Sequence, residues 1–267
     1  MTQAQDTAVE IPYRLGPAAD HEHTHTVVFL HGRGDNAQNI LNNGLDKWRD
    51  SQNRNLSDVF PTFRWVIPQA PARQLASLAF DPQIKWPQWF DVWNTRDFRE
   101  NEELQAVGLK EVVPEFRQIL ANEAEQLCGR WDRIILAGIS MGAATSLHIL
   151  FNIKEPLAAF MGLSCRLPFA GRSLAEMREI LALDDVPSHD DVIRKTPVLL
   201  EHCATDDTVP IQLGRALRDT LKGFGTQVEW KEYPTGGHWF HSPNGMDDAV
   251  VFLERHVMSK RNGIAGI

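Results

Sequence analysis

The chain has 267 residues, 43% of them hydrophobic and 23% charged, which supplies a large core and argues against global disorder. Its net charge of -8, without a long Lys/Arg cluster, argues against nucleic acid as a partner, because phosphate binding needs a basic surface. No apolar stretch approaches the roughly 18 residues that span a bilayer. The N-terminal segment is polar, and the three widely spaced cysteines suit a reducing compartment. We therefore expect a cytoplasmic protein without an integral membrane segment.

Short apolar runs alternate with helical patterns along the whole chain. We predict strands at 24–32, 63–71, 133–138, 156–164, 196–203 and 227–233. We predict helices at 101–128 (capped by Asn101), 142–151, 210–225 and 246–258, with a partly helical segment at 171–195. This alternation is typical of a mostly parallel sheet with helices on both faces, which carries its site at the carboxyl ends of the strands. We predict one α/β domain over residues 1–267.

The segment GISMG (138–142) lies between a predicted strand and a predicted helix. A serine between two glycines forms either a loose turn or a sharp bend that presents a nucleophile. The bend needs a strand before it and a helix after it, and it needs glycines where a Cβ would clash. Gly138 and Gly142 meet that need, so we interpret Ser140 as a nucleophile.

A serine hydroxyl needs a histidine base, and the base needs a carboxylate to orient it. On this fold the chain order is serine, acid, histidine. Asp206 and Asp207 both follow the strand predicted at 196–203, and His238 follows the last predicted strand. The pattern therefore predicts a triad of Ser140, His238 and one of these two aspartates, with His241 as a weaker candidate for the base.

The reaction also needs donors for the oxyanion of its tetrahedral intermediate. One is expected from the backbone N–H of Met141, directly after the serine. The second is expected from the loop LHGRGDN (30–36), through the backbone N–H of Arg33. The Arg33 side chain would then remain free for a polar end of the substrate. The alternative is that this loop is an ordinary turn at the end of a strand.

Several segments, in the same order along the chain, resemble the acyl-protein thioesterase, carboxylesterase and lysophospholipase group of small α/β-hydrolases. They are FLHGRGDN (29–36), FRWVIPQAP (63–71), WFD (89–91), RIILAGISMGAA (133–144), LSCRLP (163–168), HCATDDTVP (202–210) and GGHWF (236–240). The resemblance implies an α/β-hydrolase fold and a serine hydrolase that cleaves carboxylic esters or thioesters without a cofactor. It also implies Ser140 as nucleophile, His238 as base, Asp206 as the orienting acid, and Arg33 and Met141 as oxyanion donors.

The chain departs from the family pattern near the expected mouth of the site. Cys203 stands where the family usually has glycine, and Cys165 and Arg166 replace a small-then-aromatic pair. Met141 replaces a frequent glutamine, and residues 169–195 look like an insertion relative to compact members. These departures leave the acyl donor open between a palmitoylated protein, a lysophospholipid and a small ester. Chain-length preference is open too, and so is oligomeric state, with a homodimer as one option.

The aromatic, irregular stretch 75–98 is either a plug of the core or the lining of an acyl pocket. Under the second interpretation, five of its side chains contact the acyl group: Leu75, Leu78, Trp86, Trp89 and Phe90.

Competing functions remain at this point. A serine peptidase can use the same fold and triad order, and a catalytically silent binding protein can keep the fold. Cys203 is conceivable as a thiol nucleophile, although it lies outside the bend. His21, His23 and His25 are expected to be solvated, and a metal site formed by them has no supporting carboxylate pattern. We expect no metal and no cofactor.

Overall fold

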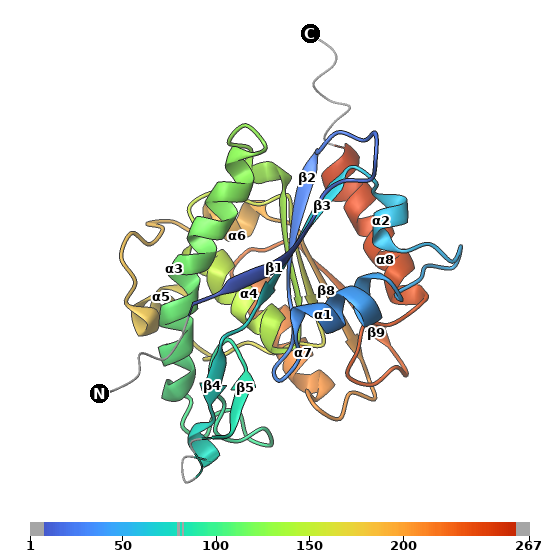
Figure 1. Cartoon of the computed structure of the whole chain (residues 1–267). Coiled ribbons are helices and arrows are strands. Elements are labelled where there is room, and N and C mark those ends of the chain that lie inside the picture. The colour runs from blue at the N-terminus through green and yellow to red at the C-terminus, as the bar shows by residue number, and fades with distance from the viewer. Residues whose placement is uncertain (1–7, 79–80, 82, 260–267) are drawn as a thin grey trace.

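The structure is a computed structural model that describes residues 8–78, 81 and 83–259. Its centre is a seven-stranded sheet in the order β1-β3-β2-β6-β7-β8-β9 (Figure 1). The strands are β1 Glu10–Leu15, β2 His25–Leu30, β3 Phe63–Gln69, β6 Ile134–Ile139, β7 Ala159–Leu163, β8 Val198–Cys203 and β9 Val228–Tyr233. Strand β1 is antiparallel to β3, and every other neighbouring pair is parallel. The carboxyl ends of the parallel strands therefore meet at one edge, the lower edge in Figure 1.

Helices cover both faces of the sheet, which confirms the predicted fold class (Figure 1). One face carries α3 Glu103–Glu125, α4 Met141–Asn152, α5 Leu174–Leu181, α6 Asp191–Lys195 and α7 Ile211–Gly223. The other carries α1 Ala37–Asn39, α2 Leu56–Val59 and α8 Asn244–Leu253. Residues of β2 alternate between the two apolar clusters, with Val28 and Leu30 in one and Val27 and Phe29 in the other. Burial on both sides explains why this strand is apolar throughout.

The six predicted strands are all present, five of them shortened and the one predicted at 133–138 shifted by one residue, whereas β1 and the small hairpin β4 Ala72–Gln74 with β5 Lys85–Pro87 were not predicted. These strands gave no clear signal because β1 is a partly exposed edge strand that contains Pro12, and the hairpin strands have three residues each. Four shorter helical segments complete the elements of the described residues: π-helical η1 Ile40–Leu45 and η4 Glu254–Met258, and 3₁₀-helical η2 Ala76–Leu78 and η3 Trp131–Arg133.

Two predictions about helices need correction. Asn101 does not cap α3, because it takes a positive φ of 48° and Glu102 stands at the N-cap position without a side-chain cap bond. The last helix begins earlier than predicted, at Asn244, and ends in the π-helical turn η4. Residues 169–195 form α5 and α6, which pack against α3 and α4, and their status as an insertion stays a prediction.

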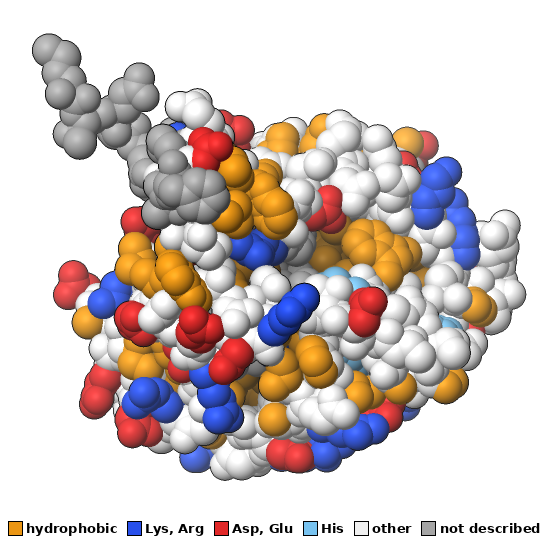
Figure 2. Space-filling model, turned by 90° about the horizontal axis from the view of Figure 1, so that it is seen from below, with side chains coloured by type: hydrophobic (Ala, Val, Ile, Leu, Met, Phe, Trp, Pro, Cys, Tyr) orange, Lys and Arg blue, Asp and Glu red, His pale blue; other side chains and the backbone are white. Residues whose placement is uncertain are grey.

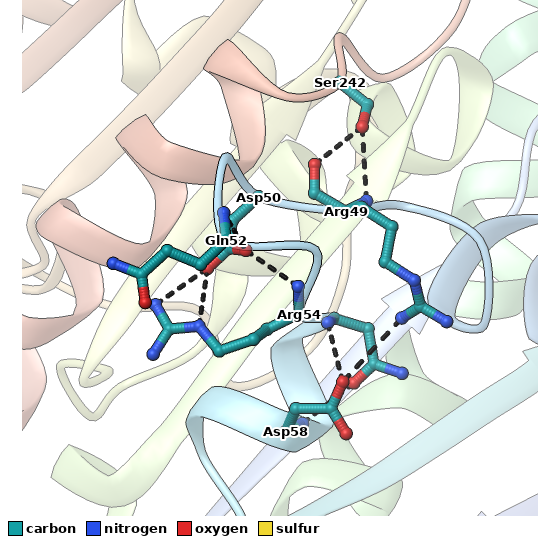
Figure 3. Close-up of polar contacts among 7 residues, drawn as sticks. Arg49, Asp50, Gln52, Arg54, Asp58 and Ser242 are labelled. Atoms are coloured by element: carbon teal, nitrogen blue, oxygen red, sulfur yellow. Dashed lines mark hydrogen bonds and ion pairs between the residues drawn. The ribbon is translucent and has the colours of Figure 1, made fainter.

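A polar cluster fastens the chain just beyond the last strand to a distant loop (Figure 3). The Ser242 hydroxyl donates to the Arg49 carbonyl at 2.6 Å and accepts from the Arg49 N–H at 3.2 Å. The loop itself is closed by Asp50, whose carboxylate accepts the N–H groups of Gln52 and Arg54 and the Arg54 guanidinium. Ser242 lies four residues after His238, so this cluster restrains the loop that carries the predicted base.

Among the helices in the described part of the chain, none combines the length and the apolar character that crossing a bilayer requires.

Candidate active site

Ser140 lies on a sharp bend between β6 and α4. Its backbone has φ 56° and ψ -124°, a strained conformation for a residue with a side chain, and its N–H donates to the Leu163 carbonyl at 2.9 Å. A Cβ on Gly142 would lie 2.2 Å from the Leu30 carbonyl oxygen, and one on Gly138 would lie 2.7 Å from the Ala143 nitrogen. Only glycine fits at both positions, so the geometry is that of a nucleophile bend and not of a loose turn.

The structure brings Asp206, and not Asp207, to His238. The His238 Nδ1 lies 2.8 Å from Asp206 Oδ2, and because an ionised carboxylate only accepts hydrogen bonds, Nδ1 is the donor. The other oxygen, Asp206 Oδ1, accepts from the backbone N–H groups of Thr208 at 3.0 Å and Val209 at 2.8 Å. Asp207 is exposed instead. The sequence left Asp206 and Asp207 as alternatives, and the fold of this loop brings Asp206 to His238.

His202 is a further partner of Asp206. Its Nε2 lies 2.8 Å from the Val209 carbonyl and 3.2 Å from Asp206 Oδ2, so a proton on Nε2 is shared between two acceptors. Burial alone would raise the pKa of Asp206, but the hydrogen bonds from His202, His238 and the Val209 N–H outweigh it and hold that pKa well below its usual range. Asp206 is therefore negatively charged at neutral pH beside the imidazole of His238.

Sequence reasoning did not assign a role to His202. The available signal was its place four residues before Asp206, at the end of the strand that carries the acid.

Ser140 and His238 line one cavity of about 440 Å³ at the carboxyl ends of the strands. Figure 2 looks at this edge from below and shows a hollow bordered by hydrophobic and histidine side chains. The next residue, Trp239, also lines the cavity, and its ring packs against Trp48 with the centroids 5.6 Å apart. His241 stacks on the Tyr233 ring and does not line this cavity, so His238, and not His241, shares it with Ser140.

The loop after β2 lies directly against Ser140. A Cβ on Gly32 would lie 3.9 Å from the Ser140 Oγ. His31 locks the loop, because its Nδ1 donates to the Gly32 carbonyl at 2.7 Å while its Nε2 accepts the Ala70 N–H at 3.0 Å. Burial lowers the pKa of His31, so this imidazole stays neutral and keeps both bonds. The Trp89 indole donates to the His31 carbonyl at 2.8 Å and fixes the loop from the other side.

The two expected oxyanion donors have free N–H groups. Among the hydrogen bonds of residues 8–78, 81 and 83–259, none uses the backbone N–H of Arg33 or Met141 as donor. Met141 is the first residue of α4, where N–H groups are unpaired and the helix dipole is positive. Both N–H groups therefore suit the binding of negative charge beside Ser140.

The Arg33 side chain is not free, contrary to expectation. Its Nε donates to Gln88 Oε1 at 2.8 Å, its Nη2 lies 4.0 Å from Asp91 Oδ1, and its guanidinium lies 5.2 Å from the centre of the Trp86 ring. Arg33 thus forms a wall of the site, with its charge partly balanced by Asp91.

The aromatic stretch 75–98 divides between pocket and core. Trp86 lines the larger cavity, and Phe90 lines a smaller one of about 70 Å³ that also contains Ser140. Trp89 is fully buried and packs against Phe116, so the structure corrects its predicted role: it supports the loop after β2 from within the core. Leu75 is buried and Leu78 lies in η2, and neither of them lines either cavity, which corrects their predicted contact with the acyl group.

The alternative thiol nucleophile, Cys203, loses support in the structure. Burial raises the pKa of Cys203 to about 11 and that of Cys165 to about 12, so both thiols stay protonated and poorly nucleophilic. His25 is buried beside Phe63 and is not solvated as expected. The described residues contain no group of three His, Cys, Asp or Glu side chains that could hold a metal ion.

Comparison with known proteins identifies the family of this chain. Residues 17–257 match the family described as Phospholipase/Carboxylesterase. An acyl-protein thioesterase 1 from Gibberella zeae is 29% identical over 91% of this chain and 95% of its own length. One from Schizosaccharomyces pombe is 28% identical over 73% and 74%.

Solved structures show the same fold. The esterase PE8 superimposes with a TM-score of 0.69 at 24% identity, covering 93% of this chain and 99% of its own. Acyl-protein thioesterase 2 from Zea mays gives a TM-score of 0.67 at 24% identity, covering 91% and 97%. The family match spans Ser140, Asp206 and His238. It shows that this chain belongs to the phospholipase/carboxylesterase family of α/β-hydrolases.

Proposed function

We propose that the protein hydrolyses carboxylic esters or thioesters of acyl groups through a triad of Ser140, His238 and Asp206. The observation that carries the proposal is the 2.8 Å hydrogen bond between His238 and Asp206, beside a cavity that Ser140 shares with His238. Acyl-protein thioesterases among the relatives supply the substrate class: an acyl ester or thioester of a small molecule or of a lipidated protein.

The mechanism follows from the roles that each group can take. His238 accepts the Ser140 proton on Nε2, since Nδ1 is committed to Asp206, and the serine oxygen attacks the acyl carbonyl carbon. The N–H groups of Arg33 and Met141 stabilise the oxyanion. The alcohol or thiol departs with the proton from His238, which leaves an acyl-enzyme on Ser140. A water molecule, deprotonated by the same imidazole, attacks this ester and releases the acid. Activity is expected to fall on acidification, because a protonated His238 cannot act as a base.

The test is the hydrolysis of p-nitrophenyl esters and of thioesters of graded acyl length by wild type and by Ser140→Ala. Loss of the nucleophile is expected to lower kcat by at least about 10⁴-fold with every acyl chain. Exposed Ser173, replaced by alanine, is a matched control that should leave the rates unchanged. Full activity of Ser140→Ala would contradict the proposal and require another nucleophile.

The same assay separates the two competing functions. A peptidase would cleave peptide anilides in preference to esters, and a silent binding protein would turn over neither. We expect ester and thioester turnover, with amides cleaved far more slowly.

A further inference from the structure

Arg166 is the least expected residue in the wall of the site. It lines the smaller cavity of about 70 Å³ together with Ser140, Met141 and Phe90, and its side chain is almost completely buried, with the residue 7% exposed. Charged side chains are rarely buried to this extent without a paired charge. A guanidinium at this depth, in the same small cavity as the reacting serine, calls for a partner.

The protein itself satisfies only part of this guanidinium. Arg166 Nη2 donates to Gln105 Oε1 at 2.8 Å, and the guanidinium carbon lies 4.0 Å from the centre of the Phe98 ring. That is its only hydrogen bond within the described chain, although a guanidinium has five N–H donors. No carboxylate of the described residues lies within 4.0 Å of it. Glu102 is near enough to raise its pKa, but Glu102 Oε1 accepts the Phe169 N–H at 2.7 Å.

The charge of Arg166 is nevertheless retained at neutral pH. Burial lowers the pKa of Arg166 only to about 10, so the guanidinium stays protonated. Gln105 also holds it in place, because the Gln105 side-chain amide is itself anchored to the Phe98 carbonyl at 2.8 Å. Arg33, the other arginine of this cavity, differs in having Asp91 at 4.0 Å to balance its charge. Among the described residues, Arg166 is therefore the arginine of this cavity that has no carboxylate within 4.0 Å.

The position of His238 decides which part of a substrate meets Arg166. The imidazole gives its proton to the leaving alcohol or thiol, so that group must lie in the larger cavity, which His238 lines. The smaller cavity shares Ser140 and Arg33 with the larger one, is lined mainly by apolar side chains besides its arginines, and does not include His238. It therefore receives the acyl group, and because it is small, an acyl chain seated there reaches Arg166 within a few atoms of the reacting carbonyl.

We propose that this hydrolase selects acyl groups that end in a carboxylate, that is, monoesters or monothioesters of short dicarboxylic acids, and that Arg166 binds the free carboxylate. This inference rests on the proposed function and names its substrate class. A bidentate arginine–carboxylate pair in a buried site gives both geometry and selectivity. The apolar wall of Phe90, Val92 and Phe98 accommodates the methylene groups between the two carboxyl carbons.

The test compares two substrates that differ only at the far end of the acyl chain: the p-nitrophenyl monoester of adipic acid and p-nitrophenyl hexanoate. Wild type is expected to prefer the adipoyl ester in kcat/KM by about 10- to 100-fold, as a charge-assisted hydrogen-bonded pair would give. Arg166→Met should abolish this preference by raising KM for the adipoyl ester, with KM for the hexanoyl ester unchanged or lower. Arg166→Lys keeps the charge and should retain part of the preference.

Two controls keep the result interpretable. Arg215→Met removes an exposed arginine of α7, paired with Glu232, and should leave the preference intact, since overall charge is not the cause. Inhibition of wild type by adipate and by hexanoate, with a neutral ester as substrate, tests the same site without any variant. Adipate should inhibit at about tenfold lower concentration.

Several outcomes would overturn the inference while the proposed function survives. Equal rates for the adipoyl and hexanoyl esters in wild type would do so, provided that Ser140→Ala abolishes both. A preference that persists in Arg166→Met would do so as well. If a lysophospholipid, whose phosphate lies on the leaving-group side, loses activity in Arg166→Met while the adipoyl ester does not, the carboxylate is not the group that Arg166 recognises.

Discussion

Two buried carboxyl groups near the carboxyl end of β8 have pKa values shifted in opposite directions. Asp206, in the loop after the strand, receives hydrogen bonds from His238, His202 and the Val209 N–H, and these hold its pKa well below the usual range. Glu201, inside the strand, is 3% exposed, and both of its carboxyl oxygens lack a hydrogen-bond partner within the described residues. The two groups differ less in burial than in the donors that surround them.

The surroundings of Glu201 favour its neutral form. Burial raises its pKa well above the usual value, and the charge of Asp248 adds to this, while Lys231 and the nearby Tyr233 hydroxyl oppose it more weakly. The hydroxyl of Tyr233 donates to Asp248 at 2.8 Å, and Lys231 also binds Asp248. A buried carboxyl therefore stays ionised only where the chain directs N–H groups at it, as residues 202–209 do for Asp206.

The strongest test of this contrast is Asp206→Asn. The amide cannot hold the imidazole in the same tautomer or stabilise its positive charge, so kcat is expected to fall by roughly 10³- to 10⁴-fold with KM nearly unchanged. Asp207→Asn, the matched control on the adjacent exposed residue, should change kcat by less than about twofold. Equal losses in both variants would contradict the assignment of the acid.

Asp206→Asn is also expected to lower thermal stability by an amount that depends on pH. Because the pKa of Asp206 is lowered on folding, its contribution is present above the unfolded value of about 3.9 and is lost as the pH falls through the folded pKa. The loss in Tm caused by Asp206→Asn should therefore be larger at pH 7 than at pH 3, as measured by thermal unfolding.

A smaller effect is expected from His202, which we assign as a positioning residue because it acts through Asp206. His202→Leu removes one hydrogen-bond donor to the Asp206 carboxylate, and kcat should fall about tenfold. The pH at which activity falls on acidification should also shift. His202→Gln places an amide N–H near the position of Nε2 and should restore most of the activity. If leucine and glutamine lower kcat equally, with an unchanged pH profile, the role of His202 is structural only.

The smallest effect is expected from Glu201→Gln, and it concerns stability. The unfolded chain ionises this group above about pH 4.3, whereas the folded chain resists its ionisation, so the native protein loses stability as the pH rises. Glutamine cannot ionise, so the variant should be more stable than wild type by on the order of 1 kcal/mol at pH 8 and by little at pH 4.

Chemical denaturation at the two pH values measures this difference. Glu125→Gln, on the exposed surface of α3, should show no such pH dependence. A Glu201→Gln variant that follows the wild-type curve at both pH values would mean that Glu201 is charged in the native protein.

Local sequence patterns determined much of this molecule. Six apolar runs became strands because a strand buried on both faces must be apolar throughout, and the bend at Ser140 was recognisable because only glycine tolerates the contacts on either side. The fold class and the family followed from the order of these segments, and the residues predicted as a triad lie in segments that meet at one edge of the sheet.

Other features depended on contacts between distant segments. Local sequence gave no reason why Trp89 should be buried behind the loop after β2 while Trp86 faces the cavity. It gave no reason why the Arg33 side chain should be occupied by Gln88 and Asp91, residues more than 50 positions away. The restraint of the histidine loop by Arg49 is of the same kind.

The sequence alone thus specified which chemical groups are present and in what order they follow the strands along the chain, because strand periodicity and steric limits at glycine are local properties. Only the tertiary structure distinguished Asp206 from Asp207, recruited His202 and buried Arg166 beside Ser140. Charge and hydrogen bonding in a buried site depend on every group within a few ångströms, and those groups come from parts of the chain that only folding brings together.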